Sequence, residues 1–162
     1  MENEFRKLIR GKAQRILFVG IGNVFRNDDG IGVYIVQRIR ESCRFMKMTV
    51  EVSLENYLSK INKLNPDLVI LVDCIDFGRI PGFTAILPIE LTDGPGMQSH
   101  HLSLSKLGEF ISVPVRVLGI QPANLSVGEN LSPGVQKAGD RIVAIIEEGN
   151  RPEERRKEFT NN

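Results

Sequence analysis

The run LVILV at Leu68–Val72 constrains the fold more than any other stretch of the sequence. It contains no polar residue, so a strand made from it must be covered on both faces, as in a parallel sheet flanked by helices. Elsewhere, continuous apolar runs alternate with helical patterns, which is the order of βαβ units. We therefore predict an α/β fold: a single three-layer domain with a mostly parallel sheet, an antiparallel or edge strand, and helices on both faces.

Shorter signals predict the neighbouring strands. Residues 16–19 give a first strand, and the alternation of Val50, Val52 and Leu54 with polar residues predicts a half-exposed second strand. The segment 82–89 reads as a further strand, and its Pro88 favours an edge or a strand end because proline cannot donate to a ladder. A last strand is expected within residues 113–120.

Helices are predicted between these strands. Ile31, Ile35 and Ile39 share one helical face, which indicates a helix from about residue 30 to 42. Ser132 followed by Pro133 is typical of a helix start, with a hydroxyl cap and a proline in the first turn.

Size and charge exclude several classes of function. A chain of 162 residues with 41% hydrophobic residues predicts one domain, with its core at about 14–148, an N-terminal extension at 1–13 and a flexible tail at 150–162. The net charge of +1 gives no case for nucleic acid or for an anionic membrane. Because no apolar run reaches roughly 18 residues and no signal peptide is visible, we expect a cytoplasmic protein. We also expect a monomer.

The cysteines indicate neither a zinc site nor a disulfide. Cys43 and Cys74 form no CxxC or zinc-type spacing. Cys74 falls at an apolar run and is expected to be a buried thiol.

The turn GIGNVFRNDDGIG, which begins at Gly20, follows the first strand and carries two carboxylates. A dinucleotide-binding turn requires a third glycine where this chain has Phe25, and acidic groups repel phosphate, so we reject a nucleotide site. One of Asp28 and Asp29 is expected to cap the following helix. The other is then free to point into the crevice at the carboxyl ends of the strands, where ligands of open α/β sheets bind.

Two further segments reach the same edge of the predicted sheet. Asp73 directly follows the apolar strand, where a carboxylate needs water or a partner. The histidines of the chain, His100 and His101, follow the loop TDGPGMQS. Two carboxylates and one imidazole from separate segments form an N/O ligand set with open positions, which suits a borderline divalent metal that arrives with another molecule.

Four segments together resemble the nickel-iron hydrogenase maturation endopeptidases, and most closely the branch that processes hydrogenase 3. They are GIGNVFRNDDGIG, LVDCIDFGRIPG, SHHLSL and LGIQP, and the resemblance runs from about residue 15 to 146. It implies removal of a C-terminal extension from the large-subunit precursor of a nickel-iron hydrogenase, after nickel insertion. Nickel, carried by the substrate, would be the recognition element, with no tightly held cofactor in the enzyme itself.

The resemblance also assigns residues. Asp29, Asp73 and His100 would bind the substrate's nickel, with His101 as the variable position of the H-x-L-x-L pattern. Asp29 and Asp73 are also the candidate catalytic groups, either of which could activate the attacking water. We expect substrate binding by Gly22 and Asn23 of the first motif and by Gln121 of LGIQP.

One departure from the family pattern keeps alternatives open. The family carries a glycine-rich turn after the second strand, whereas VEVSLENYLSK contains no glycine. A non-catalytic nickel-sensing chaperone of the precursor is therefore the main alternative. A small-molecule hydrolase with an Asp29–Asp73 acid/base pair is another.

Overall fold

The computed structural model describes residues 1–51, 53–92, 98–99 and 104–151. Its strands are β1 (Ile16–Ile21), β2 (Phe45–Val50), β3 (Leu68–Asp76), β4 (Thr84–Pro88), β5 (Gln98–Ser99) and β6 (Val115–Ile120). Its α-helices are α1 (Glu2–Ile9), α2 (Ile31–Arg38), α3 (Leu58–Lys63), α4 (Leu104–Gly108) and α5 (Pro133–Asn150). Short 3-10 helices are η1 (Asn27–Gly30), η2 (Leu54–Tyr57) and η3 (Ile89–Leu91).

The strands form one mostly parallel sheet in the order β2-β1-β3-β6-β4. β1, β2, β3 and β6 are parallel, β4 runs antiparallel to β6 at one edge, and β5 pairs with the end of β3. The predicted α/β class and the edge position of the proline-ended strand are confirmed. Pro88 is the last residue of β4, where its missing N–H interrupts no interior ladder.

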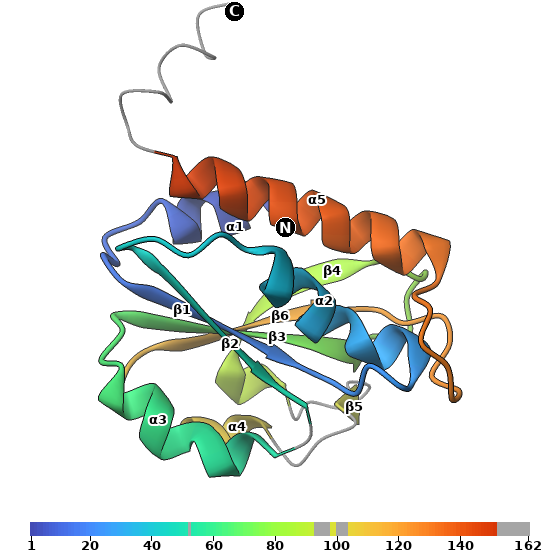
Figure 1. The fold of residues 1–162 in the computed structure, drawn as a ribbon, viewed down its shortest axis with the longest axis horizontal. Helices are drawn as coiled ribbons and strands as arrows, with labels where there is room; N and C mark the ends of the chain where they lie inside the picture. Colours follow the sequence, from blue (N-terminus) through green and yellow to red (C-terminus); the bar gives the residue numbers. More distant parts are fainter. Residues whose placement is uncertain (52, 93–97, 100–103, 152–162) are drawn as a thin grey trace, which may run out of the picture.

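Two helical layers cover the sheet, as Figure 1 shows. α1, α2 and α5 lie on one face and α3 and α4 on the other. β3 is buried from Leu68 through Ile75, and its residues alternate between the two apolar clusters, with Ile70 on the α5 side and Leu71 on the α3 side. The apolar run that predicted this arrangement therefore supplies both cores at once.

The second strand was placed wrongly. β2 spans Phe45–Val50 and pairs in register with β1 from Ile16↔Phe45 to Ile21↔Val50, whereas Leu54 lies in η2. Lys47 made this strand hard to predict, because the hydrogen bonds of its ammonium group to other parts of the chain cannot be read from the local sequence. The ammonium group donates to the carbonyls of Gln37 and Ile39 at the end of α2, at 2.9 and 2.8 Å.

The first and last helices, α1 and α5, pack together in the layer on one face of the sheet. Phe5 and Ile9 of α1, in the segment set apart as an extension, are fully buried in the core shared with α5. α5 begins at Pro133 with Ser132 as its N-cap residue, as predicted, but the Ser132 hydroxyl makes no cap hydrogen bond. α2 ends at Arg38, before the predicted limit. The tail from residue 152 onward lies outside the described residues.

No helix among the described residues has the length and apolar character needed to cross a bilayer. Cys74 is buried, as expected, and Cys43 is exposed.

Candidate functional site

The candidate site lies beyond the carboxyl ends of β1 and β3. β2 and β3 pair with opposite sides of β1, so the strand order reverses there, and such a switch point is where open α/β sheets bind ligands. The turn after β1 carries Asp28 and Asp29, and β3 carries Asp73 near its end. The loop after β6 reaches the same edge, since Cys74 is in register with Ile120.

Glycines allow these segments to approach one another closely. Gly22 has φ +134°, and a Cβ there would collide with the carbonyl oxygen of Asp29. A Cβ on Gly32 would collide with the carbonyl oxygens of Ile21, at the end of β1, and of Val72, within β3. The start of α2 therefore rests directly on the sheet edge, which brings Asp29 close to Asp73.

Asp28 holds the loop after β6 in place. It is fully buried, and its Oδ2 accepts hydrogen bonds from the backbone N–H groups of Ala123 and Asn124 and from the Ser132 hydroxyl, each at 2.8 Å. Its Oδ1 accepts the backbone N–H of Ser132 at 2.6 Å. The predicted helix-cap role is wrong, because neither η1 nor α2 has a side-chain cap hydrogen bond. The Asp28 carboxylate instead accepts its four hydrogen bonds from residues 123–132, not from the N–H groups of the following helix.

Asp29 is buried but only partly satisfied. Its Oδ2 accepts the backbone N–H of Asn23 at 2.9 Å. No described residue donates a hydrogen bond to its other oxygen, Oδ1, although this atom is buried. A buried carboxylate oxygen without a donor is costly in free energy, so Oδ1 is suited to a proton or a cation that comes with a ligand.

Asp73 is fully buried at the end of β3, and its Oδ1 accepts the backbone N–H of Cys74 at 2.8 Å. Burial, together with the negative charge of Asp29, raises the pKa of Asp73 from 3.8 to about 8. The raised pKa favours the protonated form of Asp73, and a cation bound between the two carboxylates would displace that proton. Burial also raises the pKa of the Cys74 thiol, which is thus kept protonated and is a poor nucleophile.

His100, the predicted histidine ligand, and its neighbour His101 lie outside the described residues. β5 precedes them directly, and its Ser99 pairs with Ile75, two residues beyond Asp73 in β3. Among the described residues, no group of three or more His, Cys, Asp or Glu side chains could hold a metal ion. The described part of the predicted ligand set is therefore the Asp29–Asp73 pair.

The residues predicted to bind substrate have internal roles in the structure. Gly22 and Asn23 form the turn that supports Asp29, as described above. The amide of Gln121 organises the turn after β3: its Oε1 accepts the N–H groups of Phe77 and Arg79 at 2.7 and 3.1 Å, and its Nε2 donates to Asp76 Oδ1 at 3.0 Å. Their contact with a substrate stays a prediction.

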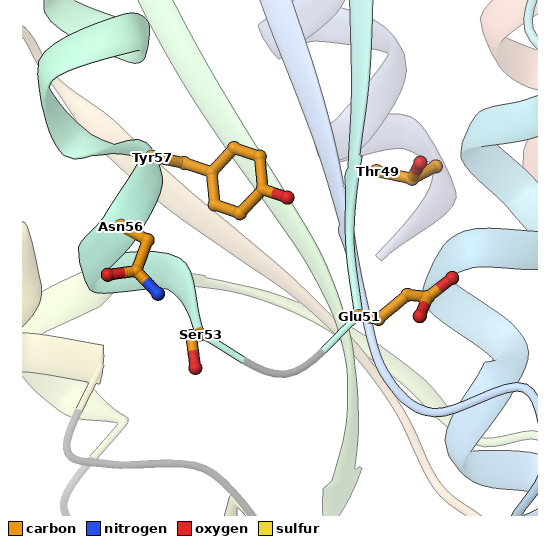
Figure 2. A pocket seen from close by; sticks show the side chains of 5 residues that line it. All are labelled: Thr49, Glu51, Ser53, Asn56 and Tyr57. Atoms are coloured by element: carbon orange, nitrogen blue, oxygen red, sulfur yellow. The ribbon is translucent and has the colours of Figure 1, made fainter.

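A pocket of about 490 Å³ opens at the end of β2 (Figure 2). Its lining comes from β2 and from the connection to α3, and it consists of Thr49, Glu51, Ser53, Asn56 and Tyr57. The backbone N–H of Gly22 donates to the carbonyl of Val50 at 3.4 Å, so the pocket adjoins the turn that carries Asp29. In the sequence, the segment between β2 and α3 was notable only for its lack of glycine.

Fold and site together define a doubly wound α/β protein whose switch-point crevice carries carboxylates, where nucleotide-binding proteins of similar topology carry a phosphate-binding turn. A model of the hydrogenase maturation protease family, HycI, matches residues 49–149. The chain belongs to this family, which is a family of peptidases, and the resemblance drawn from the sequence is confirmed.

Individual relatives agree with this assignment. A protein of Methanocaldococcus jannaschii that is assigned as a hydrogenase maturation protease is 25% identical over 153 residues, covering 83% of this chain and 90% of its own length. The crystal structure of the NiFe hydrogenase maturation protease HycI from Thermococcus kodakarensis matches with a TM-score of 0.76 and 27% identity, over 87% of this chain and 97% of that one. The solution structure of the endopeptidase HycI from Escherichia coli shares the fold, with a TM-score of 0.69 and 21% identity over 85% of this chain and 92% of that one.

Proposed function

We propose that this protein is an endopeptidase that removes the C-terminal extension from the large-subunit precursor of a nickel-iron hydrogenase. Nickel already inserted into the precursor is the recognition element, and Asp29, Asp73 and His100 bind it. The enzyme holds no metal cofactor of its own in this proposal. Membership of the maturation protease family supports the reaction class, and the site supports the role of the cation.

The buried Oδ1 of Asp29 is the observation on which the proposal rests. It lies at the switch point, without a donor among the described residues, near a second buried carboxylate. Burial and, secondly, the negative charge of Asp29 raise the pKa of Asp73, because two ionised carboxylates in this setting would repel each other. A divalent cation between them removes the repulsion and completes the coordination of Oδ1, so the site favours a metal-loaded substrate over an empty one.

The protein's own residues then position the scissile peptide. Gly22 packs against the backbone of Asp29 and Gly32 packs against Val72 of β3, so a metal bound by Asp29 and Asp73 would position the substrate at this edge. Positioning of this kind can lower a barrier by several kcal/mol. Water is the attacking group, and Asp29 or Asp73 would accept its proton.

A protein-sized substrate is consistent with the surface around the site. Phe25 and Val127 have exposed fractions of 59% and 87%, and their segments are joined by the hydrogen bond from the Gly128 N–H to the Phe25 carbonyl at 2.9 Å. Ile80, in the turn after β3, is 78% exposed. These exposed apolar side chains lie on loops at the carboxyl edge, where they are available for contact with a protein substrate.

A cleavage assay on the large-subunit precursor tests the proposal, with the precursor either loaded with nickel or empty and the products identified by mass. We expect cleavage of the loaded form alone, loss of cleavage in Asp29→Asn and Asp73→Asn, and normal cleavage in Asp67→Asn, an exposed carboxylate at the opposite edge. Stable binding without cleavage would instead favour a nickel-sensing chaperone. Equal cleavage of loaded and empty precursor would refute the role of the metal.

A further inference from the structure

The outer edge of β2 carries no neighbouring strand among the described residues. β2 is the terminal strand of the sheet and pairs only with β1. The N–H groups of Ile16 and Gly22 donate to the carbonyls of Arg44 and Val50, so the even-numbered residues of β2 face β1. The backbone groups of odd-numbered residues therefore point outward, as the hydrogen bond from the Ser42 N–H to the Phe45 carbonyl shows at the start of the strand.

The backbone of Thr49 is thus presented at the open edge beside the pocket. No hydrogen bond from a described residue occupies its outward N–H or C=O group. An exposed strand edge is a template for another extended chain, and proteins usually blunt it with charges or proline. Here the charged residue of the edge, Lys47, has its ammonium group turned back onto the end of α2, so it does not block the approach.

The pocket lies along this edge and has the character of a side-chain subsite. Thr49 and Glu51 come from the strand side, and Asn56 and Tyr57 come from η2 on the other side, with the Tyr57 hydroxyl pointing toward β2 (Figure 2). Within the described part of the chain, none of the five lining side chains makes a hydrogen bond to protein. A volume of about 490 Å³ lies in the range of ligand pockets, and its unused donors and acceptors fit a polar side chain.

We infer that the C-terminal extension of the precursor binds as an added strand along the outer edge of β2. The extended peptide exchanges backbone hydrogen bonds with Thr49, and one of its polar side chains enters the pocket. This mode of recognition, β-strand addition, takes its affinity from main-chain hydrogen bonds and its selectivity from side-chain pockets. The identity of the occupant rests on the proposed function, whereas the edge and the pocket do not.

Continuity with the candidate site favours this occupant. Val50 at the end of β2 is hydrogen-bonded to Gly22, and Gly22 is in contact with the backbone of Asp29. Neighbouring strands are about 4.8 Å apart and an extended chain advances about 3.3 Å per residue. A peptide that leaves the β2 edge therefore reaches the Asp29 turn within a few residues, so binding along β2 and positioning at the metal are compatible in one chain segment.

Backbone methylation of a synthetic peptide tests the inference. The probe is a peptide with the sequence of the precursor's C-terminal extension, in which single amide nitrogens are methylated one at a time, and binding is measured by NMR titration. We expect methylation at alternate positions to weaken binding at least about tenfold, because those N–H groups face β2, and methylation at the intervening positions to be tolerated. Loss of binding without this alternation, or tolerance at every position, would overturn the inference.

A matched pair of protein variants gives a second measurement. Thr49→Pro removes the outward N–H, and proline is tolerated on the solvent side of an edge strand. Thr49→Val keeps the backbone and removes only the hydroxyl. We expect the proline variant to keep its fold, checked by circular dichroism, and to bind the peptide about threefold to tenfold more weakly than the valine variant. Equal binding by the two variants would refute strand addition.

The two proposals fail differently. If binding depends on methylation at alternate positions but the nickel-loaded precursor is not cleaved, the endopeptidase proposal is refuted and the edge of β2 is supported as a docking site. Cleavage of the loaded precursor together with unaltered binding of every methylated peptide would do the reverse.

Discussion

Replacing Asp28 by alanine tests whether its carboxylate is a clamp between distant segments or an ordinary helix cap. The substitution leaves the N–H groups of Ala123, Asn124 and Ser132 and the Ser132 hydroxyl without their acceptor. A hydrogen bond to a charged group contributes about 1.5–3 kcal/mol, and local relaxation with entry of water recovers part of the sum. We therefore expect Asp28→Ala to lower the free energy of unfolding by about 3–5 kcal/mol, against about 1 kcal/mol for a lost cap.

Urea unfolding monitored by circular dichroism measures this difference. Asp67→Ala is the matched control: Asp67 Oδ2 also accepts two backbone N–H groups, from Gln14 and Arg15 at 2.8 Å each, but in an exposed setting. We expect a loss of about 1 kcal/mol or less there, because water replaces the missing acceptor. If Asp28→Ala cost no more than Asp67→Ala, the clamp would make no net contribution and our reading of this network would be wrong.

Three further predictions concern the site. The pKa of Asp73 in the folded protein lies above the value of 3.8 expected in the unfolded chain, so the unfolded chain releases this proton at lower pH. The free energy of unfolding should therefore fall as the pH rises from about 4 to 8. At 1.36 kcal/mol per pKa unit, the fall in the free energy of unfolding has an upper limit of about 5–6 kcal/mol. Urea titrations at several pH values measure it, and Asp73→Asn should remove the contribution of Asp73 to this pH dependence. Gly32→Ala should destabilise the fold by more than about 2 kcal/mol in thermal unfolding, because its Cβ has no room against Ile21 and Val72. A loss no larger than in Gly134→Ala, where the nearest atom to the new Cβ is 3.4 Å away, would contradict this. In the cleavage assay His100→Ala should be inactive and His101→Ala nearly normal, and the reverse result would show that the histidine assignment is shifted by one position.

The strands that the sequence predicted well are those whose burial is dictated by their own residues. LVILV must be covered on both faces wherever it lies, and Pro88 admits only an edge or an end, so β3 and β4 could be placed without knowledge of their neighbours. β2 was misplaced because its limits are set by pairing with β1, and because Lys47 is satisfied by carbonyls of α2 that no local pattern reveals.

The two adjacent aspartates show the same limit at the site. The sequence correctly indicated that one acidic residue at the start of the helix has a structural role. It wrongly indicated that the partners of this residue are the N–H groups of that helix. The actual partners of Asp28 lie 95 to 104 residues further along the chain. Such partners follow from the topology of the sheet, which brings the ends of β1 and β6 to one edge, and not from the sequence around Asp28.

The distance in sequence between Asp28 and its partners also sets when the site can form during synthesis. The turn after β1 is among the first parts of the chain to be made, yet Asp28 lacks its complete set of donors until Ser132 has been added. Until then two neighbouring acidic groups, at Asp28 and Asp29, have no buried setting and remain hydrated. Nascent chains and truncated products therefore lack the complete set of contacts around Asp28, so we expect the proposed processing activity only in chains that extend past Ser132.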